Sequence, residues 1–405
     1  MPNARFEIPL LKGRRILLGV CGSIAAYKAA ELASRLTQAG AEVDTVLTES
    51  AQKFVSGLTF QSLTGRRAYT DSDLWSQEGH VLHVGLGQQA QLLVVAPATA
   101  DTIARLAHGR ADNLLSITAL AASCPIVVAP AMDAGMFEHP ATQANLAMLR
   151  ERGVILVGPV EGRMASGLVG PGRMQEPEQL LGHIRWILGR AGPLAGQKVV
   201  VTAGGTQEPL DPVRVLANRS SGKQGFALAQ AAIDRGAEVI LIAGPTSLVT
   251  PIGAERVEVE TAAQMAEAVA EALPQAAVLL MAAAVADFRP TRAERNKIKR
   301  KAGVPQVRLE PTEDILASLG KNRPQVVVGF AAESADLLAN ARAKVEEKAL
   351  DLIVANDITA SDAGFAADTN RVTLIARNGE EQSLPLLAKA EVAEQILDKV
   401  VELLA

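Results

Sequence analysis

Residues 202–225 carry the side chains best suited to chemistry on a phosphate or a developing anion. The stretch holds a glycine pair, acids at Glu208 and Asp211, then Asn218 and a Ser-Ser-Gly-Lys run. A helical pattern follows at residues 226–235, and the start of a helix presents unpaired N–H groups with a partial positive charge. A βα connection of about 20 residues is several times the usual length, and loops that long are commonly functional. We therefore expect an anion site at this helix start.

Small and polar residues follow four apolar runs in the first half of the chain, where the backbone can approach a flat ligand closely. They are Gly22, Ser23, Ile24, Thr48, Pro97, Ala98, Thr99 and Met132. Neither half opens with a G-x-G-x-x-G fingerprint, which weakens the case for a dinucleotide. A mononucleotide needs only a phosphate cradle, and these residues predict one at the start of the first helix.

His83 is the residue of the first half with the clearest capacity to move a proton, because imidazole takes and gives protons near neutral pH. His80 lies three residues earlier, but no third ligand or cysteine cluster accompanies the pair, so we do not expect a metal site there. Downstream, residues 163–174 form a glycine-rich segment with a basic tip, which we call the flap.

Alternating apolar runs and helical patterns must position these groups. The expected strands of the first half are residues 15–20, 43–47, 92–96, 126–129 and 154–157. Those of the second half are residues 198–202, 239–242, 278–281, 326–329, 352–355 and 372–375. The alternation predicts an α/β protein with two doubly wound, Rossmann-like, mostly parallel sheets. Ligands of such sheets bind outside the carboxyl ends of the strands.

The two halves begin alike, which indicates two domains. The helical patterns at residues 24–39 and 226–235 are each followed by the sequence Gly-Ala-Glu-Val, which is typical of a junction between a helix and a strand. A glycine-rich run separates the halves. We therefore expect domains at residues 1–188 and 196–405, with a linker at residues 189–195.

Composition sets the class of protein. The 405 residues are 48% hydrophobic but only 3% aromatic, which is typical of parallel sheets buried under helices. A net charge of −4 gives no overall electrostatic footprint for nucleic acid, and two cysteines are too few for a disulfide framework. The longest apolar stretch, residues 276–286, is shorter than a membrane span. We expect a cytoplasmic protein that binds neither nucleic acid nor a membrane.

Taken in order, the motifs resemble a known family. From about Arg14 onward the chain is similar to the bifunctional phosphopantothenoylcysteine decarboxylase/phosphopantothenate–cysteine ligase of coenzyme A biosynthesis. The first half resembles the flavin-containing cysteine decarboxylases, which have a flavodoxin-like fold. The resemblance implies that the cradle residues bind FMN, which oxidises the cysteinyl thiol to a thioaldehyde so that CO2 can leave, and then returns the electrons. His83, in His-Val-Gly-Leu, matches the catalytic histidine of that family.

Two catalytic positions depart from the family pattern. Asp133 replaces an asparagine that holds the substrate carboxylate, and Ser166 replaces a flap cysteine that protonates the enethiolate. Two carboxylates ~4 Å apart at an effective dielectric of ~20 repel by about 4 kcal/mol, so an ionised Asp133 opposes binding. A serine hydroxyl is also a far weaker acid than a thiol. The changes could compensate, because a desolvated Asp133 beside a carboxylate favours its protonated form and could then supply the missing proton.

The second half resembles the ligase, in which the carboxylate joins the α-phosphate of CTP with release of pyrophosphate and the amine of cysteine then displaces CMP. Asn218 matches the residue that steadies the acyl-cytidylate, and Lys297, in a strongly basic segment at residues 289–301, matches the lysine that grips the triphosphate. Asp287 matches the acid that binds CTP together with Mg2+. The other implied CTP contacts are Met281, Ala282, Ala283, Glu313, Asp314, Ile315, Leu316, Phe330, Lys344 and Lys348.

One alternative stays open: an active CTP ligase joined to an impaired or regulatory flavin half, which Asp133 and Ser166 favour. Flavin prenyl transfer would not explain the second half, and a phosphatase-binding regulator would leave Lys297 and Asp287 without a purpose. The resemblance further implies small-molecule substrates, namely 4'-phosphopantothenate, cysteine and CTP. It also implies a homo-oligomer, a dodecamer built from trimers of the flavin half and dimers of the ligase half.

Overall fold

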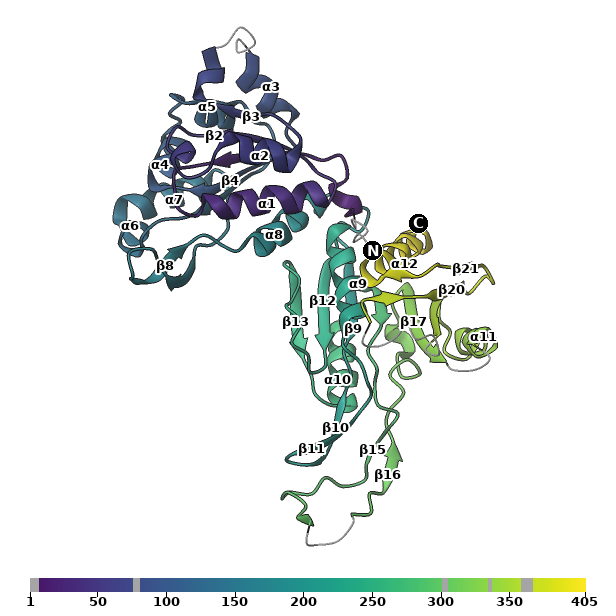
Figure 1. Ribbon diagram of the computed structural model, residues 1–405. Coiled ribbons are helices and arrows are strands. Elements are labelled where there is room, and N and C mark those ends of the chain that lie inside the picture. Colours follow the sequence, from purple (N-terminus) through teal and green to yellow (C-terminus); the bar gives the residue numbers. More distant parts are fainter. Residues whose placement is uncertain (1–6, 76–80, 301–304, 334–336, 358–366) are drawn as a thin grey trace. The chain divides into compact units, whose positions relative to one another are not determined.

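The chain divides into two compact units, Met1–Leu188 and Gly189–Ala405. The structure, a computed structural model, describes residues 7–75, 81–300, 305–333, 337–357 and 367–405 (Figure 1). Each unit is a sheet covered by helices on both faces, so the predicted α/β class with doubly wound, mostly parallel sheets is confirmed.

The described part of the first unit contains a six-stranded parallel sheet in the order β3-β2-β1-β4-β5-β6. The strands are β1 (Arg15–Val20), β2 (Glu42–Leu47), β3 (Ala68–Thr70), β4 (Leu92–Ala98), β5 (Ile126–Pro130) and β6 (Ile155–Leu156). The winding direction reverses between β1 and β4. In such sheets the crevice outside the carboxyl ends at this point is the usual ligand site.

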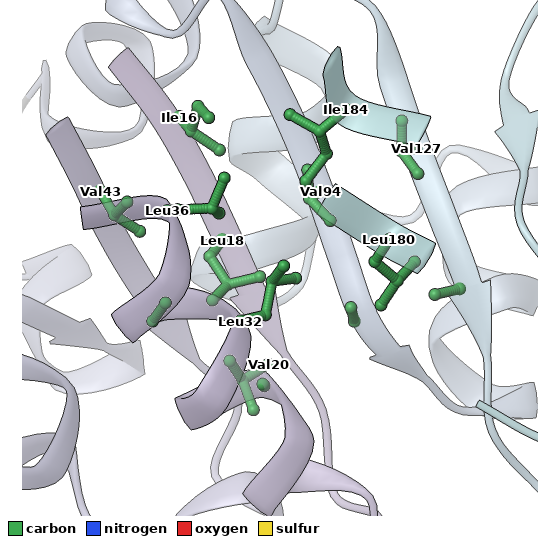
Figure 2. Close-up of a cluster of buried hydrophobic side chains, with 14 of the residues drawn as sticks. Ile16, Leu18, Val20, Leu32, Leu36, Val43, Val94, Val127, Leu180 and Ile184 are labelled. Carbon is green, nitrogen blue, oxygen red and sulfur yellow. The ribbon is translucent and has the colours of Figure 1, made fainter. Parts of the chain in front are cut away.

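Two buried clusters hold the first sheet between its helices. Figure 2 shows one of them, in which Leu18 of β1 meets Leu32 and Leu36 of α1, while Val94 and Ile184 lie farther along the same face. This face is covered by α1 (Ala26–Gln38), α2 (Gly57–Thr64) and α8 (Pro177–Gly189). The opposite face is covered by α3 (Leu82–Gln89), α4 (Ala100–His108), α5 (Leu114–Ala121) and α7 (Pro140–Glu151). Because both faces are covered, the central strands β4 and β5 are apolar throughout rather than alternating.

The second unit repeats this winding and then extends it. Its main sheet has the order β13-β12-β9-β14-β17-β18-β20-β21, in which the last two strands are antiparallel. The strands are β9 (Lys198–Ala203), β12 (Glu238–Ala243), β13 (Ala254–Glu258), β14 (Ala276–Met281), β17 (Val326–Glu333), β18 (Leu352–Asp357), β20 (Val372–Ala376) and β21 (Glu381–Ser383). Here the winding reverses between β9 and β14.

Helices cover both faces of the second sheet as well. On one face, buried side chains of α10 (Ala262–Ala272) and α11 (Leu337–Glu347) pack on the strands. On the other, α9 (Lys223–Asp234) packs against α12 (Lys389–Leu404), as Figure 1 shows. Arg235, just after α9, joins the two helices through an ion pair with Glu394 at 2.7 Å. At the other end of α9, Gln224 Nε2 donates to the carbonyl of Lys389 at 3.2 Å, which holds the starts of α9 and α12 close to each other.

Residues 189–195, which the sequence analysis assigns to a linker, pack closely against the end of α9. The amide of Leu194 donates to the carbonyl of Arg235 at 2.8 Å, and the Leu194 side chain is fully buried. A Cβ on Gly192 would lie 2.4 Å from the same carbonyl oxygen, so only glycine fits there. The described structure thus docks this segment onto the second unit.

Three hairpins lie where no strand was predicted. The connection at residues 202–225, expected to be a loop, contains β10 (Gln207–Asp211) and β11 (Arg214–Ala217), and α9 begins three residues earlier than expected. The flap lies largely within a hairpin of β7 (Val160–Arg163) and β8 (Val169–Arg173). The third hairpin pairs β15 (Phe288–Pro290) with β16 (Leu309–Pro311). Strands of three to five residues are too short to leave a clear hydrophobic pattern.

Candidate active sites

A cavity of about 670 Å³ opens at the carboxyl edge of the second sheet. Its walls come from the end of the long β9–α9 connection, the residues after β14, and positions on β17 and β18. It therefore lies at the point where the winding of this sheet reverses, and its size suits a nucleotide-sized ligand.

The cavity gathers most of the residues that the sequence analysis assigned to the ligase. Those that line it are Asn218, Met281, Ala282, Ala283, Asp287, Glu313, Asp314, Ile315, Leu316, Phe330, Lys344 and Lys348. They come from five separate parts of the chain. The fold brings them together because parallel strands end at the same edge of a sheet.

Buried hydroxyls fix the wall that follows β14. Thr202 Oγ1 accepts a hydrogen bond from the amide of Ala283 at 3.1 Å, and Thr206 Oγ1 accepts one from Ala286 at 2.9 Å. Both threonine residues are fully buried. Opposite this wall, Asn218 Nδ2 donates to the carbonyl of Val285 at 2.9 Å. The Asn218 amide is thus oriented at the rim, with an oxygen and a second N–H group beyond the bond that orients it.

Asp314 and Lys348 form an ion pair at the cavity wall, with 3.0 Å between Oδ2 and Nζ. Burial raises the pKa of Asp314, but the hydrogen bonds from Lys348 and from the amides of Ala317 and Leu316 outweigh it, so the pKa is lowered from its usual value. The carboxylate stays ionised at neutral pH and offsets part of the positive charge of Lys348.

The cavity also holds polar residues for which the sequence analysis proposed no role, among them Asn356, Asn370 and Lys389. Lys223, from the Ser-Ser-Gly-Lys run expected to form an anion site, lines it too. Lys389 is 7% exposed, and burial, together with the charge of Lys223, lowers its pKa, while Asp368 opposes the shift. Lys223 and Lys389 are the first residues of α9 and α12, so two helix N-termini bring positive charge to one end of the cavity. The sequence signal for Lys389 was weak, because a lysine at a helix start has many ordinary uses.

Lys297 is the ligase residue that the structure does not bring to the cavity lining. It is exposed and lies in the long connection between β15 and β16. The next residue, Ile298, donates its amide to Asp211 Oδ2 at 3.1 Å. The described arrangement therefore docks the Lys297 region on the β10–β11 hairpin.

The cradle residues of the first unit surround the carboxyl ends of β1, β2, β4 and β5. The amide of Cys21 donates to the carbonyl of Pro97 at 3.3 Å, which joins the end of β1 to β4. A Cβ on Gly22 would lie 2.4 Å from Cβ of Ser50, so this turn requires glycine. Ser23 and Ile24 precede α1, whose N-cap residue provides no side-chain cap, and Ile24 is 63% exposed. A tight turn, an uncapped helix start and an exposed apolar side chain together suit a phosphate-bearing flat ligand.

The other cradle residues take defined places at the same edge. Thr48 is buried directly after β2, and its amide donates to the carbonyl of Val20 at 3.0 Å. Pro97 and Ala98 end β4, and Thr99 caps α4 by accepting from the amide of Thr102. Met132 follows β5, where its amide donates to the carbonyl of Gly172 at 3.0 Å.

The two positions that depart from the family pattern are bonded to each other. Ser166 Oγ donates to Asp133 Oδ2 at 2.6 Å, which joins the flap to the residues after β5. Asp133 also caps α6 (Ala134–Glu138), since its Oδ1 accepts from the amide of Gly135 at 3.2 Å. The pair is open to solvent in the described structure, so the desolvation that the compensation hypothesis requires has to come from a bound ligand or another subunit.

Backbone contacts hold the flap in this position. Besides the Met132–Gly172 bond, the buried Lys28 of α1 donates to the carbonyl of Met174 at 3.0 Å and pairs with Glu176 at 2.7 Å. A Cβ on Gly172 would lie 2.3 Å from the carbonyl oxygen of Met132. The flap strand can approach the β5 connection this closely only because residue 172 is glycine.

Gly172→Ala is therefore expected to destabilise the first unit by about 1–3 kcal/mol, because the rigid backbone oxygen of Met132 cannot move aside. Calorimetry of the full chain should show the transition of one unit shifted to lower temperature. Gly57→Ala serves as the matched control, since its Cβ would make an ordinary 3.6 Å contact with Ala68. Equal melting curves for the two variants would contradict the proposed close fit.

His83 lies on α3, and its Nδ1 atom is buried without a hydrogen-bond partner among the described residues. Buried polar atoms in native proteins are nearly always paired, so a ligand, water or second subunit is the expected partner. His80 lies outside the described residues. Within the described ranges, no three or more His, Cys, Asp or Glu side chains gather as a metal cluster would require.

The chain matches two protein families, one in each unit. Residues 9–188 match the family described as Flavoprotein, and residues 194–404 match the DNA/pantothenate metabolism flavoprotein C-terminal domain. Coenzyme A biosynthesis bifunctional protein CoaBC of Bacillus subtilis is 45% identical over 398 residues, which are 97% of this chain and 98% of that protein. CoaBC of Mycobacterium tuberculosis is 46% identical over 409 residues, covering 97% of each chain.

The chain belongs to the CoaBC family. Among solved structures, the C-terminal domain of a CoaBC is 40% identical and covers 53% of this chain and 98% of its own, with a TM-score of 0.46. A PPC decarboxylase mutant complexed with pantothenoylaminoethenethiol is 35% identical and covers 43% and 97%, with a TM-score of 0.40. Because the CoaBC match runs through both units, the alternative of an impaired or regulatory flavin half is not favoured. The helices in the described part of the chain are all too short or too polar to cross a bilayer.

Proposed function

We propose that the second unit joins 4'-phosphopantothenate to cysteine with CTP, and that the first unit uses FMN to decarboxylate the product, phosphopantothenoylcysteine, to 4'-phosphopantetheine. As a member of the CoaBC family, the chain is a bifunctional enzyme of coenzyme A biosynthesis, a ligase and a lyase. The observation that carries the assignment is the cavity between the ends of β9 and β14, which gathers twelve of the residues expected for the ligase. We assign residues 1–188 to the lyase, 196–405 to the ligase and 189–195 to the segment between them.

The ligase step needs an activated acid. A carboxylate oxygen of 4'-phosphopantothenate attacks the α-phosphorus of CTP, the bond to the β-phosphate breaks, and pyrophosphate leaves. The cysteine amine then attacks the acyl carbon of this acyl-cytidylate, loses a proton, and CMP departs as the amide forms. Both steps build negative charge on phosphate oxygens, which positive side chains and helix N-termini stabilise.

Each ligase residue has a place in this scheme. Asn218, fixed at the rim by Val285, steadies the acyl-cytidylate through its amide. Asp287 is an exposed carboxylate at the cavity wall, and Mg2+ is commonly held by one or two carboxylates together with substrate phosphates. The residues present therefore suit a magnesium ion that arrives with the nucleotide. Lys297 supplies positive charge to the triphosphate, and Phe330 offers its backbone to the cytosine edge.

Lys348→Met is expected to raise KM for CTP about 10- to 100-fold, because hydrogen bonds to charged groups contribute roughly 1.5–3 kcal/mol. The loss also leaves the Asp314 carboxylate unopposed beside the phosphates. The variant Asp314→Asn/Lys348→Met, which removes both charges, should recover part of the affinity. Steady-state kinetics with varied CTP measure this effect. Lys399→Met, which breaks pairs with Glu380 and Glu402 outside the cavity lining, is the control and should leave KM unchanged.

The first unit suits FMN on three observations: the glycine-only turn at Gly22, the uncapped start of α1 and the small residues that end β4. FMN held by these residues would supply the two-electron redox chemistry that lets the cysteinyl carboxyl group leave as CO2. His83 handles a proton in this sequence. The Asp133–Ser166 pair supplies a proton to the sulfur-bearing product when Asp133 is protonated, since the serine hydroxyl can relay it over a 2.6 Å bond.

Product analysis tests both halves of this function. Purified protein is incubated with 4'-phosphopantothenate, cysteine, CTP and MgCl2, and pyrophosphate release is followed while products are identified by mass spectrometry. A visible flavin spectrum reports FMN. We expect pyrophosphate, CMP, CO2 and 4'-phosphopantetheine. Absence of pyrophosphate would overturn the ligase assignment, and accumulation of phosphopantothenoylcysteine by flavin-loaded protein would overturn the lyase assignment.

We also propose that the enzyme works in the cytoplasm as a homo-oligomer, a dodecamer. The support in the described structure is the number of exposed apolar side chains on the first unit, such as Trp75 at 88% and Leu58 at 69% exposure, together with the unpaired Nδ1 of His83. Light scattering of the purified chain gives the mass directly. A monomeric mass would contradict the proposal.

A further inference from the structure

We propose that Asp211 and Arg214 are positioning residues for Lys297: they clamp the backbone of Ile298 and so set where the neighbouring lysine is presented. The inference rests on the proposed role of Lys297 in CTP binding. It gives a role to Asp211 and Arg214, the two charged residues at the turn of the β10–β11 hairpin.

Asp211 is the centre of the clamp. Its side chain is fully buried, and each carboxylate oxygen accepts two hydrogen bonds. Oδ1 accepts from the amides of Val213 and Arg214 at 2.8 and 2.9 Å, and Oδ2 accepts from the Arg214 guanidinium at 2.6 Å and from the amide of Ile298 at 3.1 Å. Burial on its own raises the pKa of Asp211, but these donors outweigh it and the pKa is lowered. The carboxylate is therefore charged and fully bonded at neutral pH.

Arg214 completes the grip on Ile298. Its Nη1 donates to the carbonyl of Ile298 at 3.2 Å as well as to Asp211. The amide and the carbonyl of one residue are thus held by opposite members of one ion pair. A third bond, from the amide of Glu294 to the carbonyl of Leu210 at 3.0 Å, fixes the approach to this point.

The clamp acts on the residue next to it. Lys297 precedes Ile298 and Lys299 follows it, and both lysine side chains are exposed. A fixed backbone lets an exposed lysine search only its side-chain rotamers, whereas a free loop would lose backbone freedom as well when it grips the nucleotide. An ion pair whose arginine is 47% exposed contributes little net stability by itself, so its use here is better explained by geometry.

The test compares Asp211→Asn in two backgrounds. In the otherwise native chain, we expect kcat/KM for CTP to fall about 10- to 100-fold, while decarboxylation of supplied phosphopantothenoylcysteine is unchanged. In a Lys297→Ala background, the same substitution should cost less than about twofold, because the group that it positions is gone. An equal fall in kcat/KM in both backgrounds, or no fall in the native one, would overturn the proposal and leave Asp211 with a purely structural role.

Two further variants and a second measurement keep the result interpretable. Arg214→Lys keeps the charge on a shorter side chain, whose ammonium reaches Asp211 and Ile298 less well, so it should show an intermediate loss. Arg289→Gln breaks the 2.9 Å pair with Glu310 on the neighbouring β15–β16 hairpin and should have no effect. Exchange of the backbone amide hydrogens of residues 294–300 should be faster in Asp211→Asn than in the native protein. An unchanged exchange rate would contradict the proposal that Asp211 holds this segment. If wild-type protein releases no pyrophosphate, the ligase assignment fails, and the exchange result still decides the clamp.

Discussion

His83→Asn is expected to lower decarboxylation about 100- to 10,000-fold, the usual contribution of a positioned general acid–base group. Asparagine retains hydrogen-bonding capacity and a similar reach but cannot exchange a proton near neutral pH. The ligase cavity lies in the other unit, so pyrophosphate release should be unchanged. CO2 release from supplied phosphopantothenoylcysteine measures the first activity, and pyrophosphate release measures the second, on one preparation.

His108→Asn is the matched control for this prediction. His108 ends α4 on the surface and contacts Asn145 at 3.0 Å, so its replacement should leave both rates as they are. The flavin spectrum of His83→Asn should equal that of the native protein, which separates lost chemistry from lost cofactor. Native rates of decarboxylation in His83→Asn would remove this histidine from the mechanism.

Asp133→Asn is expected to slow formation of 4'-phosphopantetheine about 100-fold or more, because it leaves Ser166 without an acid to relay from. Ser166→Cys alone should also be impaired, because a thiol is a weaker hydrogen-bonding group than a hydroxyl and relays the Asp133 proton less well. The double variant, Asp133→Asn/Ser166→Cys, restores both residues of the family pattern. It should recover activity to within about tenfold of native.

The recovery in the double variant is the decisive result for the Asp133–Ser166 pair. Residues that act as one hydrogen-bonded unit show strongly non-additive substitutions, whereas independent residues show effects that add. Rates of product formation for the four proteins give the coupling directly. Full activity of Asp133→Asn alone, or additive losses in the double variant, would show that the pair does not carry the proton.

Much of the fold could be predicted because buried parallel strands leave a clear signal in sequence. Every strand expected in the second half has a counterpart in the eight-stranded sheet, and the glycine-to-strand junctions after residues 39 and 235 lie where the pattern placed them. The three hairpins could not be predicted from the sequence. β10 and β11 are short, and the side chains of β11 are all exposed, so neither alternation nor apolarity marks them.

Most residues of the ligase cavity could be predicted from the sequence, but their arrangement in space could not. Strand ends such as Met281 and Phe330 had to converge, because parallel strands share an edge. Lys389 could not be found this way, since it begins a helix and lies 33 residues after Asn356, the cavity-lining residue of β18. Nor could the sequence reveal that Ser166 bonds Asp133, because a contact between residues 33 positions apart depends on how the flap folds back.

The shared strand order of the two sheets has a practical meaning. Both sheets begin with the same strand order, so the two proposed reactions, a redox reaction and a nucleotide-driven amide synthesis, differ through the connections between the strands. The connection after β1 is a tight turn, whereas the one after β9 is a long segment with its own hairpin. A protein engineer could therefore keep both sheets and change the chemistry by exchanging the connections at their carboxyl edges.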